Sequence, residues 1–161
     1  EAYETLTLIQ TGKASMIPIV CVEGAGGDYW HEFDRFTKYL LRRGLVSEED
    51  PGLYHVATTP EEAADHVTRF YRIYHSSRYV RDDLVIRLRH RLRDEDVERI
   101  ADRFKVLIKR GTMSQRGPYE VEDDHLELPR LCFMHTKHKF GMVRRLIDAI
   151  NDCEPAEART S

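Results

Sequence analysis

Two carboxylates lie close together at the start of the chain, where Glu1 and Glu4 are three residues apart. Residues 1–11 carry apolar side chains at helical spacing, and positions i and i+3 of a helix share one face. Two carboxylates on one face can stabilise a developing positive charge or orient a water molecule. Alternatively, they are first-turn acids that the helix dipole favours.

A second group of reactive side chains lies in residues 71–80, which are dense in Tyr, Arg, His and Ser. Tyrosine can stack on a base and arginine can bind phosphate, so the segment is a candidate binding site. It is equally compatible with a domain linker that has aromatic anchors. Its spacing indicates no catalytic triad. The candidate residues are Arg72, His75, Ser76, Ser77, Arg78 and Tyr79.

Residues 84–92 alternate between apolar and basic side chains, which predicts a half-exposed strand. Arg87, Arg89 and Arg91 would form a basic stripe on its polar face, suited to an anionic effector or RNA. A solvated strand face, neutralised by acids that follow from Asp94 onward, is the alternative.

Two further patterns have weaker chemical meaning. Residues 24–27, Gly-Ala-Gly-Gly, follow a strand and precede a helix, as a phosphate loop does, but no acidic residue stands out after the next strand. We therefore favour a flexible turn, with a loop at the rim of an active site as the alternative.

The histidines near Cys132 match no zinc spacing, so we expect neither a metal nor another cofactor. These histidines are His125, His135 and His138.

The first half of the chain predicts alternating helices and strands. Helices are expected over 1–11, from Asp28 to about Arg43, and from Thr59 to about residue 75; strands are expected over 16–22 and 53–57. This order is typical of half of a doubly wound, Rossmann-like α/β fold. Two parallel strands alone make a marginal sheet, and no capping residue precedes Glu1. We therefore expect this chain to be the C-terminal part of a longer protein.

The second half predicts the order β-α-β-β-α. Strands are expected over 84–92, 112–115 and 131–135, with helices from Asp94 to Gly111 and over 139–150. An acidic, proline-flanked stretch, 118–129, separates the last two strands. This order favours a small appended α+β domain with its helices on one face of an antiparallel sheet. The predicted domains are 1–76 and 82–151, followed by a disordered tail, 152–161.

The composition indicates an ordinary globular protein. Of the 161 residues, 41% are hydrophobic and 33% are charged, and the net charge is −3, which gives no signal for nucleic acid or membrane surfaces. No apolar run approaches the roughly 20 residues that span a bilayer. The three cysteines are far apart, which suits a reducing cytoplasm.

The sequence Glu1-Ala-Tyr-Glu4, followed by Leu-Thr-Leu-Ile-Gln10-Thr-Gly12, resembles the helix that follows the PGGxGTxxE motif of the LOG ("Lonely Guy") family, long called lysine decarboxylases. The motif's glutamate would be Glu1, whereas its PGGxGT residues and the family's arginine are not among the 161. The similarity extends to about Phe70. Residues 71–150 resemble the C-terminal region of a longer bacterial subgroup described only as Rossmann-fold proteins.

The resemblance implies hydrolysis of a nucleoside 5′-monophosphate to free base and ribose 5-phosphate, without a cofactor. Glu1 would act at the ribose as the catalytic residue, with Glu4 and Thr5 binding substrate. Polar positions similar to Thr5 and Gln10 recur in the family, although helix polarity also explains both. Family members are usually homodimers. The 161 residues alone are expected to be inactive.

Two other functions stay open from the sequence. The protein is a non-catalytic, nucleotide-binding regulator if the appended domain senses an anion through Arg87, Arg89 and Arg91. Alternatively, the appended domain serves only assembly.

Overall fold

The computed structural model describes residues 1–156, so the last part of the predicted tail, 157–161, lies outside the described residues. The first part of the chain contains α1 (Ala2–Gln10), β1 (Ile19–Val22), α2 (Tyr29–Arg42), the 3-10 helix η1 (Asp50–Leu53), β2 (Tyr54–Ala57) and α3 (Pro60–Phe70). The second part contains β3 (Tyr74–Val80), β4 (Asp83–Leu88), α4 (Asp94–Arg103), the 3-10 helix η2 (Lys105–Leu107), β5 (Ile108–Arg116), β6 (Arg130–His135) and α5 (Phe140–Asn151).

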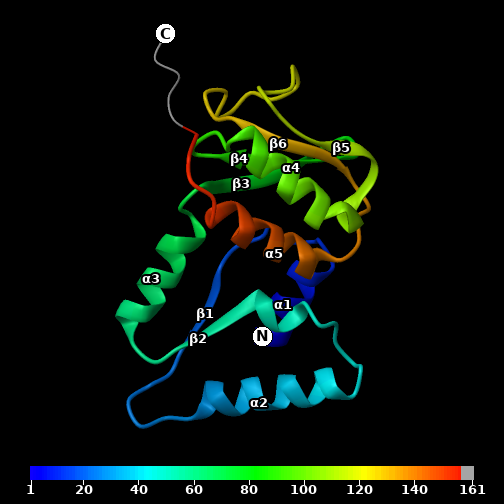
Figure 1. The fold of residues 1–161 in the computed structure, drawn as a ribbon. Coiled ribbons are helices and arrows are strands. Elements are labelled where there is room, and N and C mark those ends of the chain that lie inside the picture. The colour runs from blue at the N-terminus through cyan, green and yellow to red at the C-terminus, as the bar shows by residue number, and fades with distance from the viewer. Residues whose placement is uncertain (157–161) are drawn as a thin grey trace.

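The first part is a mixed helix and strand unit built on two parallel strands. Strands β1 and β2 pair in parallel from Ile19 opposite Tyr54 to Val22 opposite Ala57, and α2 connects them (Figure 1). The start of α3 is well determined by sequence, because the Thr59 hydroxyl accepts a hydrogen bond from the Glu62 amide at 3.1 Å and Pro60 occupies the first helical turn.

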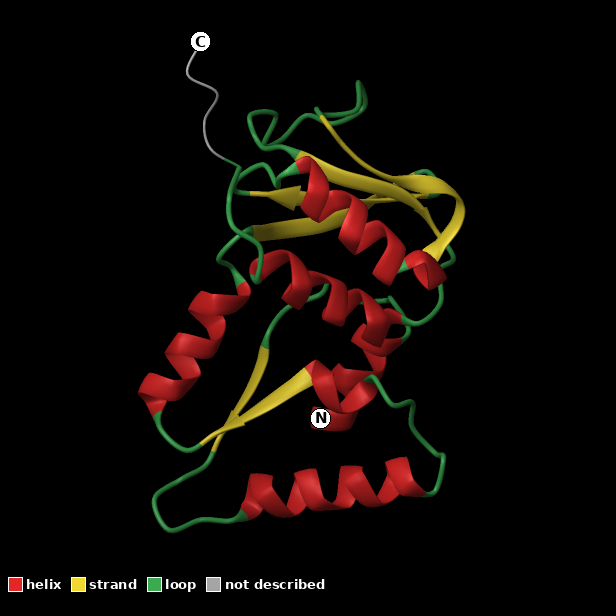
Figure 2. Ribbon diagram, viewed as in Figure 1, coloured by secondary structure: helices red, strands yellow, loops and turns green. Residues whose placement is uncertain are grey.

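The second part is a four-stranded antiparallel sheet in the order β3-β4-β6-β5. Apolar side chains of β4 and β6, among them Ile86 and Phe133, belong to the same buried cluster as residues of α4 and α5. Both helices therefore lie on one face of this sheet (Figure 2). The opposite face has a small cluster of Val80, Val85 and Cys132, against which Tyr119 packs. The α/β class is confirmed, with one parallel and one antiparallel sheet.

Helix α5 joins the two parts into one core. It lies between the antiparallel sheet and the parallel strands (Figure 1). The large buried cluster contains Ile9, Met16 and Leu53 from the first part together with Leu146 and Ile150 of α5. Gly12, at a φ of +70°, approaches the Phe140 ring so closely that a Cβ there would lie 2.1 Å from Cζ. The core thus crosses the boundary that the sequence predicts around residues 76–82.

The buried side chain of Asn151, at the end of α5, organises the passage from α3 to β3. Its Oδ1 accepts hydrogen bonds from the amides of Ile73 at 2.8 Å and Tyr74 at 2.9 Å, and its Nδ2 donates to the Phe70 carbonyl at 2.5 Å. Buried backbone groups need such partners where a helix ends. The Asn151 side chain is the partner of three such backbone groups.

This connection corrects the predicted element boundaries. Helix α3 ends at Phe70 rather than near residue 75, and residues 74–80 form β3, so the second part has the order β-β-α-β-β-α. The strand predicted over 84–92 ends at Leu88, and the helix after Asp94 ends at Arg103, with β5 beginning at Ile108. The apolar pattern of the sequence still looked helical over residues 71–74, because Tyr71 and Tyr74 also pack on the core beside Phe70.

The start of the predicted tail is held in place. Cys153 is 3% exposed, Pro155 forms a β-bridge with Leu92, and the amide of Ala156 donates to the Arg91 carbonyl at 2.8 Å. Among residues 1–156, no helix combines the length and apolar character needed to cross a bilayer.

We predict that Asn151→Ala lowers the free energy of unfolding by about 3 kcal/mol, because two amides and one carbonyl lose their buried partners. Urea unfolding at neutral pH measures this loss. Asp152→Ala is the matched control, since its ion pair with Arg69 is exposed on both sides and contributes about 1 kcal/mol or less. Equal stability of the two variants would contradict the role given to Asn151.

Candidate functional site

The carboxylates of α1 are exposed and unpaired. Glu1 occupies the N-cap position and Glu4 the first turn, and within the described residues neither side chain forms an ion pair or a hydrogen bond. The exposed Thr5 donates its amide to the Glu1 carbonyl at 2.9 Å, as the first helical hydrogen bond. The carboxylates of Glu1 and Glu4 therefore remain available to a ligand at the N-terminus of α1.

Gln10 has a structural contact instead. Its Nε2 donates to Asp50 Oδ2 at 2.5 Å, and the same oxygen accepts the Ser47 amide at 2.8 Å. Gln10 thus connects the end of α1 to η1, which explains its polarity without a substrate.

The glycine loop, 24–27, precedes α2, whose first backbone amides already have a hydrogen-bond partner. Glu23 Oε2 accepts hydrogen bonds from the amides of Trp30 at 2.8 Å and His31 at 3.2 Å. A Cβ at Gly27 would lie 2.9 Å from Glu23 Oε1, so the glycine makes room for this carboxylate. A phosphate would have to displace Glu23 from these amides, which favours the turn over the phosphate loop.

The candidate residues of 71–80 do not gather at one site. Arg72 binds the carbonyls of Asn151 and Cys153 at 2.5 and 3.0 Å, which anchors the chain after α5. The other five lie along β3, where successive side chains alternate between the two faces. On the face of α5, the Ser77 hydroxyl lies 3.1 Å from the Tyr74 hydroxyl, and the Tyr79 hydroxyl lies 2.5 Å from His135 Nδ1.

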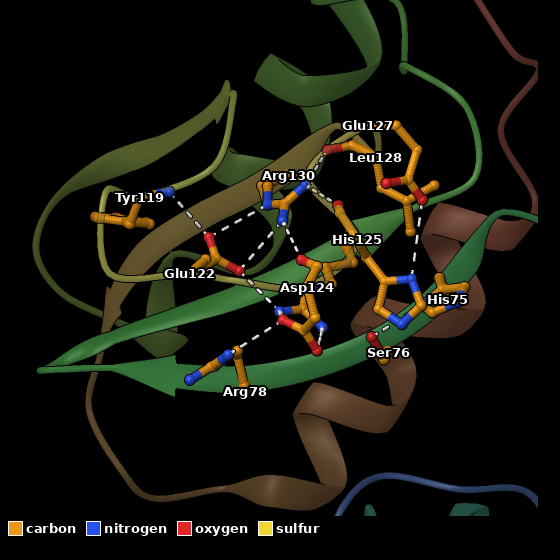
Figure 3. Close-up of polar contacts among 11 residues, drawn as sticks. His75, Ser76, Arg78, Tyr119, Glu122, Asp124, His125, Glu127, Leu128 and Arg130 are labelled. Carbon is orange, nitrogen blue, oxygen red and sulfur yellow. Dashed lines mark hydrogen bonds and ion pairs between the residues drawn. The ribbon is translucent and has the colours of Figure 1, made fainter.

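On the opposite face, His75 and Arg78 contact the acidic stretch 118–129. The ring of His75 lies 4.5 Å from that of His125, and its Nδ1 is 2.9 Å from the Ser76 hydroxyl. Arg78 Nη1 donates to Asp124 Oδ1 at 3.4 Å (Figure 3). These two residues therefore share a surface with the stretch, which separates them from Arg72 and Ser77.

The predicted basic stripe does not form. Arg87 is 4% exposed, and its guanidinium donates to Glu122 Oε1 at 2.9 Å and to both oxygens of Asp124 at 2.5 and 3.1 Å. Arg89 lies beyond the end of β4 and donates Nε to the Tyr71 carbonyl at 2.9 Å. Of the three, Arg91 alone has an exposed side chain without a polar partner among the described residues. The alternation of apolar and basic residues correctly predicted the face of the strand on which Arg87 lies, but it did not predict that another segment covers that face.

The stretch 118–129 covers that face through a buried ion cluster, which sequence reasoning missed (Figure 3). The side chains of Glu122 and Arg130 are both 0% exposed and form an ion pair at 3.3 Å. Arg130 Nη1 also donates to the carbonyls of His125, at 2.8 Å, and Leu128. The signal in the sequence was an acidic stretch following an arginine-rich strand.

Burial of the Glu122 carboxyl raises its pKa, but the Tyr119 amide and the guanidinium groups of Arg130 and Arg87 outweigh it. Together they lower the pKa of Glu122 to about 2. Within residues 1–156, no group of three or more His, Cys, Asp or Glu side chains is arranged to hold a metal ion. The cluster around Glu122 is a structural ion network, and the exposed carboxylates of α1 are the stronger candidates for chemistry.

Comparison with protein-family models finds a match to the first part of the chain. Residues 1–67 match the family model described as "Possible lysine decarboxylase", which confirms the resemblance to the LOG family. The match ends within α3, so the antiparallel sheet and α5 lie outside it. No curated protein and no solved structure matches the chain.

We predict that Glu122→Gln costs about 3 kcal/mol of unfolding free energy at neutral pH, because two buried arginines lose a charged partner. The pKa of Glu122 is depressed in the folded state, so its stabilisation is complete above the ordinary carboxyl pKa and is lost as the pH falls toward about 2. Urea unfolding between about pH 5 and pH 2 should therefore show a steeper loss of stability in the parent than in the variant. Glu120→Gln, on the exposed side of the same stretch, is the control. Parallel pH profiles of the parent and Glu122→Gln would contradict this assignment.

Proposed function

We propose that residues 1–67 form part of the active site of a nucleoside 5′-monophosphate phosphoribohydrolase, which releases a free base and ribose 5-phosphate. The observation that carries this proposal is the family match together with the exposed carboxylates of Glu1 and Glu4 at the start of α1, which have no partner among residues 1–156. In this proposal, β1 and β2 belong to a larger parallel sheet of the Rossmann type.

The position of Glu1 suits cleavage of an N-glycosidic bond. The transition state of such a reaction resembles an oxocarbenium ion, so a carboxylate near C1′ or O2′ stabilises its positive charge or orients the attacking water. The free amides at the start of α1 and the positive end of its dipole favour a phosphate nearby. Glu4, one turn along, and Thr5 would hold the ribose.

The proposed enzyme is a cytoplasmic homodimer, in keeping with its family. Exposed apolar side chains on two helices of the first part, α1 and α2, support an interface there. They are Tyr3 and Leu8 of α1, and Tyr29, Phe36 and Tyr39 of α2. The alternative of an anion sensor built on Arg87, Arg89 and Arg91 loses support, because Glu122 and Asp124 already neutralise Arg87.

We predict that Glu1→Gln lowers kcat/KM for the hydrolysis of AMP or a related monophosphate by at least about 100-fold. The assay uses the longest natural polypeptide that contains this chain, since the PGGxGT residues are not among its 161. Release of base and of ribose 5-phosphate is measured by chromatography over a panel of nucleotides.

Glu61→Gln is the matched control, because Glu61 is an exposed first-turn acid of α3. If both glutamates only complement helix dipoles, both variants will lose a little stability and neither will lose activity. That outcome, or no hydrolysis by the parent, would contradict the proposal.

A further inference from the structure

A hollow of about 410 Å³ lies on the sheet face that stretch 118–129 covers, outside the segment matched by the family model. It is bordered by the β3–β4 turn, by the end of β5 and by the start of the stretch. Its volume is within the range of pockets for small molecules. None of the residues that line it takes part in the function proposed above.

One side of the hollow is apolar. Val80 and Met134 line it, and Val121 stands at the edge with 63% of its surface exposed. The Tyr119 ring packs against Val80 and its neighbours, and its hydroxyl donates to Asp83 Oδ2 at 2.6 Å. This side can accept a small apolar group and exclude water from it.

The other side carries two arginines that have no carboxylate partner among the described residues. Arg116 places its guanidinium 3.8 Å from the centre of the Tyr119 ring, which fixes its orientation. Arg81, in the β3–β4 turn, is exposed, and its side chain forms no hydrogen bond with the described residues. Both line the hollow.

Three carboxylates also line the hollow, those of Asp82, Asp83 and Glu120. Asp82 forms an ion pair with Lys137 at 2.6 Å, and Asp83 accepts the Tyr119 hydroxyl. Glu120 is exposed at the border. Among the described residues, none of these three carboxylates is paired with Arg81 or Arg116, so both guanidinium groups keep their donors for an anion.

The backbone at Arg81 adds a second observation. Arg81 has a φ of +57°, a conformation that favours glycine, and yet the turn presents a long cationic side chain toward the hollow. A turn selected for geometry alone would favour glycine or asparagine at this position.

We propose that this hollow binds a small organic phosphate. Arg81 and Arg116 hold the phosphate group, because guanidinium groups bind phosphate oxygens with charge-assisted hydrogen bonds. The organic part lies on Val80 and Met134. This ligand site belongs to the second part of the chain and is separate from Glu1.

Methyl NMR of the full chain tests the proposal. The chain contains four methionines, so ¹³C-methyl labelling gives a simple spectrum in which Met134→Leu identifies the reporter signal. The probes are phenyl phosphate, inorganic phosphate and phenol. We expect phenyl phosphate to shift the Met134 signal saturably, with an affinity at least about tenfold higher than that of inorganic phosphate, and phenol to have no saturable effect.

Two variants remove the arginines in different ways. Arg81→Gly suits the positive φ and should keep the fold, whereas Arg116→Gln removes the cation stacked on Tyr119. Each should weaken phenyl phosphate at least about tenfold, while Arg91→Gln, at an exposed arginine elsewhere, should leave binding unchanged. The proposal is overturned if the Met134 signal does not respond saturably, if Arg81→Gly binds as the parent does, or if Arg91→Gln weakens binding equally.

Discussion

The docking of α5 is the constraint on which the rest of the structure depends. A two-stranded parallel sheet buries too little apolar surface to be stable by itself. Here the first part shares its core with a helix that also covers the antiparallel sheet, and Asn151 and the Gly12–Phe140 contact determine where that helix lies. The position of α1, and hence of Glu1, follows from this packing, because Ile9 on the same helix is buried in the shared core.

The opposite face of the antiparallel sheet is covered by the stretch 118–129, which is held there by ion pairs, and not by a second layer of helices. Arg87 and Arg130 are nearly or fully buried on this face, and buried guanidinium groups require paired, hydrogen-bonded carboxylates. Glu122 is such a carboxylate, and its ion pairs with Arg87 and Arg130 hold the stretch 118–129 against this face. Tyr119 is thereby placed next to Arg116, so the same ion cluster that closes the face also shapes the hollow at its border.

Local sequence signals predicted the elements that depend on local physics. The capping residue Thr59 predicted where α3 begins. The apolar spacing of residues 139–150 predicted α5 over nearly its whole length. The strand β3 was missed, because the side chain that ends α3 at Phe70 is that of Asn151, 81 positions further along the chain. The alternation of 84–92 indicated the two faces of β4 but could not show that an acidic stretch would bury Arg87. The helical spacing of residues 1–11 predicted that Glu1 and Glu4 lie near each other at the start of a helix, whereas the hollow beside Arg81 is formed by three segments that only folding brings together.

The shared core implies that the two parts of the chain unfold as one cooperative unit joined by α5. Trp30, the single tryptophan, reports on the first part by fluorescence, and the Met134 methyl signal reports on the antiparallel sheet. Both probes are followed through the same urea titration. We expect a single transition with coincident midpoints for the two probes. Two separate transitions, with the Met134 signal still native where Trp30 is already unfolded, would contradict it.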